Sequence, residues 1–260
     1  MKHFYLYPLL LFALFSCGNC QKAAKGPQHL TLMTYNVGVF GKYMENSTEG
    51  VAALINRSGA RYVGLNETDS LTTRHYAYQV KDLAQALGAD WNYFFARAMA
   101  YQGGAYGNGV VTKTPIKYRY RVALPKGEGS EPRSAAVVET EECVFASAHL
   151  DHRSPEAALA HMKTLNDWFA AVYKNCKKPV FLCGDFNVEP ESDVIKLAKT
   201  SWTLLSGTAN TYSSKNLRKC IDYIFAYKDA APVTVESAQV ITEGTQELSD
   251  HCPIVITVRY

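Results

Sequence analysis

Asp185 and Asn187 are the two residues whose types and spacing most clearly offer chemistry. They follow residues 180–183, an apolar run typical of a buried strand, and Gly184 lets the backbone approach a neighbour closely. Side chains alternate along an extended chain, so both polar groups would leave the same face. A carboxylate and a carboxamide at such a rim suit Mg²⁺ or a phosphate-bearing ligand. The alternative is that Asp-Phe-Asn only ends the strand in a turn.

Other polar residues gather where further predicted strands end, and functional groups commonly lie at such positions on α/β scaffolds. They are Asn36, Glu67, Arg133, His149, Asp151, His152, Asp222, Asp250 and His251. Each alone has a plain structural explanation, because an asparagine often forms a turn and a single histidine is often only a satisfied polar residue. Their occurrence together in one chain favours one shared site.

The hydrophobic pattern predicts short strands that alternate with a few helices. The predicted strands cover residues 30–37, 61–65, 91–96, 110–111, 116–124, 134–139, 144–149, 180–183, 221–226, 233–241 and 254–258. The predicted helices cover 51–59, 78–87, 155–173 and 194–198. The glycine-rich stretch 101–109 is predicted to be a loop, and it lacks the spacing of a nucleotide-binding motif. We expect one domain, and the strand blocks indicate two sheets.

Composition places the chain among globular proteins. It has 260 residues, of which 47% are hydrophobic and 20% are charged. The formal net charge of +3 and the lack of a dense Lys/Arg cluster do not mark a strong polyanion binder. Charge alone therefore leaves nucleic acid undecided as a partner.

The first residues predict export. Lys2 precedes an apolar run, residues 4–15, which is too short to span a bilayer. Leu-Phe-Ser-Cys17 resembles a bacterial lipoprotein signal, which implies cleavage before Cys17 and a diacylglyceryl group on its sulfur. We expect 1–16 to be a signal peptide, 17–28 an anchor and tether, and 29–260 a catalytic domain held at the bacterial envelope membrane. Ordinary secretion to the periplasm or medium, or a buried N-terminal helix, are the alternatives.

The cysteines do not predict a zinc site or a defined disulfide set. Of seven cysteines, six remain when Cys17 is assigned to the anchor, and the sequence cannot choose among their pairings. Cys183, Cys220 and Cys252 lie in or beside apolar runs, which favours buried thiols.

The order of the polar motifs resembles the endonuclease/exonuclease/phosphatase superfamily. The matching pieces are Thr-Tyr-Asn36-Val, Leu-Asn-Glu67, Tyr-Gly-Asn108-Gly, Pro-Arg133, His149-Leu-Asp-His, Gly-Asp185-Phe-Asn187, Ile-Asp222-Tyr and Ser-Asp250-His251. The Gly-Asp-Phe-Asn and Ser-Asp-His pieces are the specific ones. The resemblance implies a four-layer α/β sandwich, with two packed mixed β-sheets flanked by helices, and a metal-dependent phosphoesterase.

The resemblance also implies a role for each residue, with Mg²⁺ as the cofactor and Mn²⁺ as its substitute. Glu67, Asn36 and Asp250 would hold the metal. Asp185 would position or deprotonate water, and Asn187 would hold that water or a phosphoryl oxygen. His251, oriented by Asp222, and His149 would contact the phosphate. Arg133, Asn108 and Tyr106 would bind substrate.

Two positions depart from the superfamily pattern. Asn66 stands where glutamine is more common before the metal glutamate, which should be tolerated. Asp69 stands where some nuclease members have arginine, which puts a DNA-type contact in doubt.

The substrate stays open among several phosphate esters. The favoured reading is a monomeric phosphodiesterase acting on nucleic acid, a lipid head group or a small phosphodiester. A phosphomonoesterase, or a non-catalytic surface binding protein with the same fold, are the alternatives. Residues 203–219 are the expected substrate loop, and tyrosines within 101–106 could stack on bases or line an apolar pocket.

Overall fold

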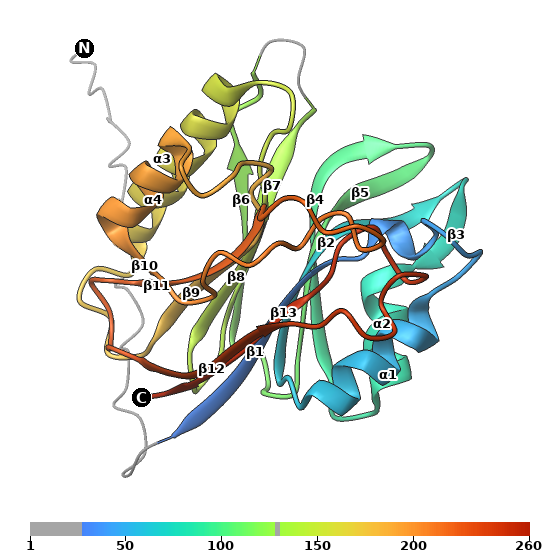
Figure 1. The fold of residues 1–260 in the computed structure, drawn as a ribbon, viewed down its shortest axis with the longest axis horizontal. Helices are drawn as coiled ribbons and strands as arrows, with labels where there is room; N and C mark the ends of the chain where they lie inside the picture. The colour runs from blue at the N-terminus through green and yellow to red at the C-terminus, as the bar shows by residue number, and fades with distance from the viewer. Residues whose placement is uncertain (1–27, 128–130) are drawn as a thin grey trace, which may run out of the picture.

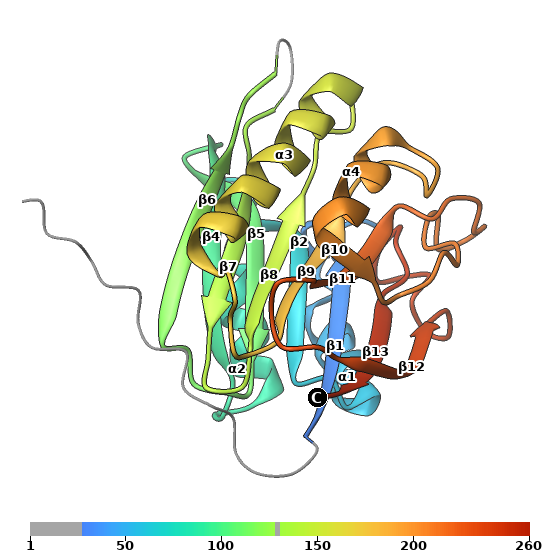
Figure 2. The ribbon, with the colours of Figure 1, turned by 90° about the vertical axis from the view of Figure 1, so that its left-hand side faces the viewer.

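Two β-sheets pack face to face, and helices cover the outer face of each (Figures 1 and 2). This computed structural model describes residues 28–127 and 131–260. The predicted signal peptide and all but the last residue of the tether therefore lie outside the described residues. The predicted four-layer α/β sandwich is confirmed. Among the described residues, no helix is both long and apolar enough to cross a membrane.

The first sheet has the strand order β12-β13-β1-β2-β5-β4, with β3 paired to β2. Its strands are β1 (His29–Asn36), β2 (Tyr62–Thr72), β3 (His75–Tyr78), β4 (Asn92–Tyr101), β5 (Gly104–Thr112), β12 (Thr234–Val240) and β13 (Ile254–Arg259). Helices α1 (Thr48–Ser58) and α2 (Gln79–Leu87) pack on its outer face through one apolar cluster. A short 3₁₀ turn, η1 (Gly38–Phe40), follows β1.

The second sheet has the order β10-β11-β9-β8-β7-β6. Its strands are β6 (Tyr118–Leu124), β7 (Arg133–Glu139), β8 (Val144–His149), β9 (Val180–Asp185), β10 (Trp202–Leu204) and β11 (Asp222–Tyr227). Helices α3 (Pro155–Val172) and α4 (Asp193–Ser201) cover its outer face through a second apolar cluster. A third cluster fills the space between the sheets with side chains from both.

Each sheet has a single parallel pair near its centre, and each pair is joined by a helix. Strands β1 and β2 are parallel with α1 between them, and β8 and β9 are parallel with α3 between them. Parallel strands end at the same edge of a sheet, so their last residues become neighbours. Asn36 pairs in register with Asn66, and His149 pairs with Asp185.

Antiparallel neighbours add residues to the same edge. Asp222, the first residue of β11, pairs with Asp185 at the end of β9. Asp250 and His251 precede β13, which runs antiparallel to β1. The topology therefore brings polar residues from six separate segments to one edge of the sandwich.

Three local predictions were wrong. The glycine-rich stretch expected to be a loop forms most of strand β5, because Gly104 and Gly107 let the neighbouring backbone approach where a Cβ would overlap it. Strands β3 and β10 were not predicted. Strand β2 continues past residue 65 to Thr72 and pairs with β5 on both sides of an irregularity between Leu65 and Thr68.

The cysteines of the described region are buried thiols. Cys143, Cys176, Cys183, Cys220 and Cys252 form no disulfide with one another. Burial raises the pKa of Cys143 and Cys183 to about 12 and that of Cys220 to about 11. The predicted buried thiols at positions 183, 220 and 252 are confirmed.

Candidate active site

A cavity of about 510 Å³ opens at the edge where the polar residues meet. Its lining comes from both sheets and from the loops that follow them. The lining residues are Glu67, Tyr106, Glu131, Arg133, His149, His152, Asp185, Asn187, Tyr212, Lys219, Ile221, Asp250 and His251. Most of the residues predicted from sequence therefore face one space.

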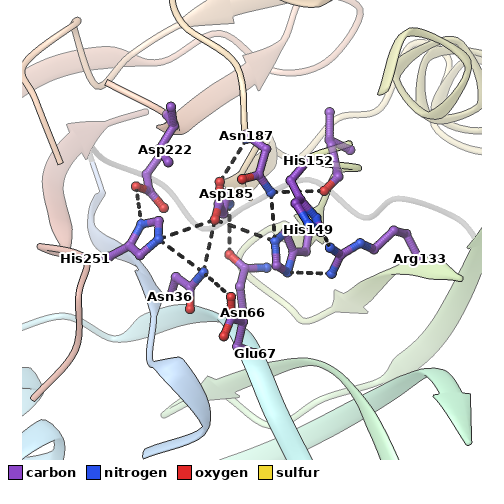
Figure 3. Close-up of polar contacts among 12 residues, drawn as sticks. Asn36, Asn66, Glu67, Arg133, His149, His152, Asp185, Asn187, Asp222 and His251 are labelled. Carbon is purple, nitrogen blue, oxygen red and sulfur yellow. Dashed lines mark hydrogen bonds and ion pairs between the residues drawn. The ribbon is translucent and has the colours of Figure 1, made fainter. Parts of the chain in front are cut away.

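Asp185 lies at the centre of this group, with Asn36, His149 and His251 pointing toward it (Figure 3). Its Oδ2 accepts a hydrogen bond of 3.0 Å from the Asn36 amide, and its Oδ1 accepts one of 2.8 Å from the Asn187 backbone. The Nε2 atoms of both histidines lie 3.6 Å from Oδ2. Burial raises the pKa of Asp185, although the His251 charge opposes this. A raised pKa suits a carboxylate that accepts a proton near neutral pH.

His251 is held by Asp222 and covered by a tyrosine. Its Nδ1 donates to Asp222 Oδ2 over 2.8 Å, and the same oxygen accepts a 2.6 Å hydrogen bond from the Thr211 hydroxyl. The Tyr212 ring centre lies 4.9 Å from the imidazole centre. Burial alone would lower the pKa of His251, but the charges of Asp222 and Asp185 raise it. The raised pKa favours the imidazolium form, in which the Nε2 proton faces Asp185.

His149 faces Asp185 from the opposite side and has different electrostatics. Burial, then the neighbouring Arg133 charge, lowers its pKa well below the usual value, so the ring is neutral. Donor groups face both of its ring nitrogens: Arg133 lies 3.1 Å from Nδ1, and the Asn187 amide nitrogen lies 2.9 Å from Nε2, the nitrogen beside Asp185. In the tautomer that accepts from Arg133, the ring proton is on Nε2 and His149 can donate to an oxygen in the cavity.

Arg133 joins two histidines on one wall of the cavity. It is 3% exposed and also donates to His152 Nδ1 over 3.1 Å, while Glu131 lies 3.3 Å from the same guanidinium. Its buried Nε has no hydrogen-bond partner among the described residues. This wall therefore carries positive charge and hydrogen-bond donors, which suits a phosphoryl group.

Glu67 and Asp250 are the carboxylates best placed for a divalent cation. Both line the cavity, and Asp250 Oδ2 pairs with Lys42 over 2.8 Å. Glu67 has a backbone φ of +55°, which is costly for a residue with a side chain. The irregularity in β2 thus turns a carboxylate into the cavity. Two carboxylates and open space for water fit Mg²⁺, which needs one or two protein carboxylates.

A second acidic group also converges here but does not resemble a magnesium site. One ligand-type atom from each of Asp185, Asp222 and His251 lies within 4.8 Å of the others. His251 and Asp222 already bond each other through these side chains, and Mg²⁺ prefers oxygen over imidazole nitrogen. This group therefore presents a carboxylate–imidazole pair beside a second carboxylate and not a set of free oxygen ligands.

Asn36 is oriented by its surroundings. The backbone nitrogen of Gly38 donates to its Oδ1 over 3.1 Å, so its amide nitrogen faces Glu67 Oε1 at 3.1 Å and Asp185 Oδ2 at 3.0 Å. In this arrangement the side chain donates to two carboxylates, and its Oδ1 keeps one lone pair beyond the Gly38 hydrogen bond. Asn36 lies beside the predicted metal carboxylate Glu67, and its role as a metal ligand stays a prediction.

The residues predicted to bind substrate lie in different surroundings. Tyr106 lines the cavity, and burial, then Glu67, raises the pKa of its hydroxyl. Asn108 is not among the lining residues, and its amide is engaged by Asn66 at 3.0 Å and by the Ser134 carbonyl at 2.6 Å. Asn108 therefore links the two sheets behind the cavity wall.

Several contributors to the site had no role assigned from sequence. His152 had a signal in the His-Leu-Asp-His motif, and Tyr212 and Lys219 lie in or at the end of the stretch expected to approach substrate. Asn66 was recognised only as a tolerated departure within the Leu-Asn-Glu67 motif. Its Oδ1 accepts from the Asp185 backbone over 2.9 Å, and its Nδ2 donates to the Ala148 carbonyl over 3.0 Å, so it fixes the central aspartate.

The comparisons with known proteins agree on the fold. A family model described as the endonuclease/exonuclease/phosphatase family matches residues 33–251. No curated protein matches the chain by sequence.

Several solved structures superpose over most of their length. A mannosyl-6-phosphatase from Bacteroides thetaiotaomicron has a TM-score of 0.73 at 17% identity, covering 89% of this chain and 100% of that chain. The 2′,3′-cyclic phosphatase ANGEL2 has a TM-score of 0.69 at 12% identity, covering 90% and 95%. The human Nocturnin catalytic domain, with bound sulfate, has 0.65 at 19%, covering 88% and 94%. The TM-scores show that these proteins share the fold of this chain, and at such low identities they show the fold alone.

Proposed function

Because this chain belongs to the endonuclease/exonuclease/phosphatase family, we propose that it is a Mg²⁺-dependent hydrolase of phosphate esters, acting foremost on phosphodiesters. Members of the family are metal-dependent phosphoesterases. The observation that carries the proposal is the position of Asp185, which lies between two buried imidazoles and faces the same cavity as Glu67 and Asp250.

The reaction needs water to be aimed at phosphorus while negative charge on the phosphoryl oxygens is offset. Asp185 would orient the water and accept its proton at Oδ2, and its raised pKa supports this role. The ester P–O bond would break as the bond from water to phosphorus forms, and the leaving oxygen would take its proton from solvent water. The Nε2 protons of His251 and His149, one from each side, would donate to phosphoryl oxygens. Asp222 would keep the His251 ring in place and stabilise its charge.

Mg²⁺ bound by Glu67 and Asp250 would supply positive charge next to the phosphate. Asn36 would keep the two carboxylates Glu67 and Asp185 apart and oriented by donating to both. Because Lys42 pairs with Asp250, a cation bound by this carboxylate would compete with that ion pair.

A phosphomonoesterase is the second candidate, and the wall formed by Arg133, His149 and His152 favours it. Donors clustered on one wall would suit the extra charge of a terminal phosphate. One structural relative is by name a mannosyl-6-phosphatase, which acts on a monoester, whereas another is named for a 2′,3′-cyclic phosphate, which is a phosphodiester.

A substrate panel tests the proposal and separates these classes. The purified protein would be incubated with Mg²⁺ and plasmid DNA, sphingomyelin, inositol phosphates, mannose 6-phosphate or bis-p-nitrophenyl phosphate. We expect EDTA to abolish turnover and Mg²⁺ to restore it. Hydrolysis of monoesters alone would replace the phosphodiesterase assignment, and inactivity on every ester would refute the proposed function.

We also propose that the protein is exported and anchored through Cys17, on the support of the signal-like residues 1–16. Cells grown with a labelled fatty acid should incorporate the label into the wild-type chain and not into Cys17→Ser. Equal labelling of both, or recovery of wild type from the cytoplasm, would contradict the anchor.

A further inference from the structure

The active-site cleft continues beyond Glu67 into a second cavity of about 350 Å³. Glu67, Tyr106 and Glu131 line both cavities, so the two spaces share one wall. The far side of the second cavity carries two cationic side chains, Lys42 and Arg74. A ligand whose reacting group lies beside Asp185 can therefore extend past Glu67 toward these cations.

Arg74 is held rigidly at this position. Asp69, which is 0% exposed, accepts from its Nε over 2.6 Å and from its Nη2 over 2.9 Å. The guanidinium carbon lies 4.5 Å from the Tyr101 ring centre and 5.7 Å from that of Tyr106. A guanidinium that is fixed by a carboxylate and aromatic rings loses little further entropy when it binds a ligand.

The arrangement leaves part of the guanidinium available. Asp69 uses one proton of Nε and one of Nη2, and no described residue accepts from the remaining Nη protons. The Arg74 side chain is 32% exposed and lines the cavity. Planar, paired N–H donors of this kind match a phosphate or carboxylate.

We propose that Arg74 is a specificity-determining residue that binds a second anionic group of the substrate, such as a phosphate next to the scissile one. The inference rests on the proposed function, because it assumes that the scissile ester lies beside Asp185. The competing explanation is that Arg74 only ties β3 to β2 through Asp69.

Paired esters separate these explanations. The first pair is the p-nitrophenyl ester of thymidine 5′-phosphate with and without a 3′-phosphate, and the second is glucose 1,6-bisphosphate against glucose 6-phosphate. For each variant, the readout is the ratio of kcat/KM within a pair, which cancels any change common to both substrates. Preference in the first pair alone indicates a nucleotide chain as the source of the second phosphate, and preference in the second alone indicates a small sugar bisphosphate.

We expect wild type to favour the doubly phosphorylated member of at least one pair by about tenfold, the size of one charge-assisted hydrogen bond. Arg74→Gln should bring that ratio close to one. Arg74→Lys should keep part of the preference, since lysine retains the positive charge and can pair with Asp69 but lacks the paired N–H donors of a guanidinium. Arg119→Gln, at an exposed position on β6, is the matched control and should keep the wild-type ratio.

A purely structural role would lower melting temperature without moving the ratio, and an unchanged ratio in a folded Arg74→Gln would overturn the inference. A wild type that shows no preference in either pair would overturn it too. If wild type hydrolyses nothing, the proposed function fails separately. In that case, calorimetry with thymidine 5′-phosphate and thymidine 3′,5′-bisphosphate tests the Arg74 subsite directly. Equal affinities of wild type for the two ligands exclude the subsite, and tighter binding of the bisphosphate that is lost in Arg74→Gln supports it.

Discussion

At the scale of single residues, Asp185 differs from the other carboxylates in being placed between a charged and a neutral imidazole. The charged ring, His251, would hold phosphate, and the neutral ring, His149, would donate a proton-bearing nitrogen to it. Their opposite pKa shifts follow from their neighbours, since carboxylates surround His251 and a guanidinium touches His149. Asp185 is therefore the residue whose loss should be most costly to turnover.

Asp185→Asn should lower kcat by more than about 100-fold, because the amide keeps the size of the side chain but cannot accept the proton of water. The measurement is kcat on the best ester of the panel, with melting temperature as the folding check. Asp167→Asn, on an exposed carboxylate of α3, is the control. Near-normal turnover by folded Asp185→Asn would remove Asp185 from the proton transfer.

The residue types of the site could be predicted from the sequence, but several of the contacts between their side chains could not. Motifs at strand ends identified Glu67, Asp185 and His251. The absence of arginine at position 69 also pointed away from a cationic contact there, yet the buried Asp69 holds Arg74 beside the cleft. Such pairs depend on how β2 and β3 fold back on each other, and no periodicity in the sequence contains that information.

At the scale of strands and helices, Gly184 decides how closely β8 and β9 can approach at the site. Its φ is +139°, and a Cβ would overlap the Ala148 carbonyl oxygen. Gly184→Ala should therefore lower the free energy of unfolding by about 3 kcal/mol, combining overpacking with backbone strain. Denaturant titration measures the loss.

Gly59→Ala is the matched control for this change. Gly59 also has a positive φ, +72°, but a Cβ at this position would meet no atom within 4 Å. Only the cost of the left-handed backbone applies, about 1 kcal/mol. Equal losses for both substitutions would show that the close approach to Ala148 is not what requires glycine.

Helix α3 carries a buried titratable group, His161, whose Nε2 donates to the Pro125 carbonyl over 2.8 Å. Its Nδ1 is buried without a partner among the described residues, and burial lowers the pKa of the ring below 6.5. The unfolded chain therefore binds this proton at a higher pH than the native protein does. The free energy of unfolding should fall as pH drops below about 6.5.

His161→Gln should make this pH dependence shallower, because glutamine keeps a donor for Pro125 but does not titrate. Some dependence should remain, since the lowered pKa of His149 acts with the same sign and the raised pKa of Asp185 acts with the opposite sign. Denaturant midpoints between pH 5 and pH 7 measure the slope, with the exposed His29→Gln as control. An unchanged slope in His161→Gln would contradict the assignment.

Most strands and helices followed from apolar periodicity, and the failures have physical causes. Strand β5 was missed because glycine disfavours isolated strands, whereas here it permits the close pairing with β2 and β4. The position of Glu67 within a strand was missed because an irregularity in pairing depends on the partner strand. Sequence periodicity describes one segment at a time.

At the scale of the whole molecule, binding of Mg²⁺ should raise stability, because its proposed ligands Glu67 and Asp250 come together only when β2 and the loop before β13 are folded. At 100 times the dissociation constant the gain is about 2.7 kcal/mol, or roughly 5–10 °C in Tm for a domain of this size. Thermal unfolding with and without Mg²⁺ measures it. Glu67→Gln should abolish the shift and the exposed Glu191→Gln should keep it; a full shift in Glu67→Gln would exclude Glu67 as a ligand.

The two-sheet arrangement itself was predictable in outline, since strand blocks in each half of the chain indicated two sheets. The order of strands within each sheet was not. It depends on long-range pairing, such as β1 between β2 and β13, which joins residues more than 200 positions apart. That pairing is what places Asn36 and His251 in one cleft.

The five buried thiols make the domain's resistance to oxidation depend on whether the chain is folded. While the chain is folded, these five thiols are withheld from oxidants, so oxidising conditions should leave the described domain unharmed. Once the chain unfolds, all five thiols would become exposed together, and air would oxidise them to non-native disulfides. Thermal unfolding should therefore be reversible with a reductant and irreversible without one. Replacing Cys143 and Cys252 by alanine should increase the fraction of protein that refolds after heating without a reductant.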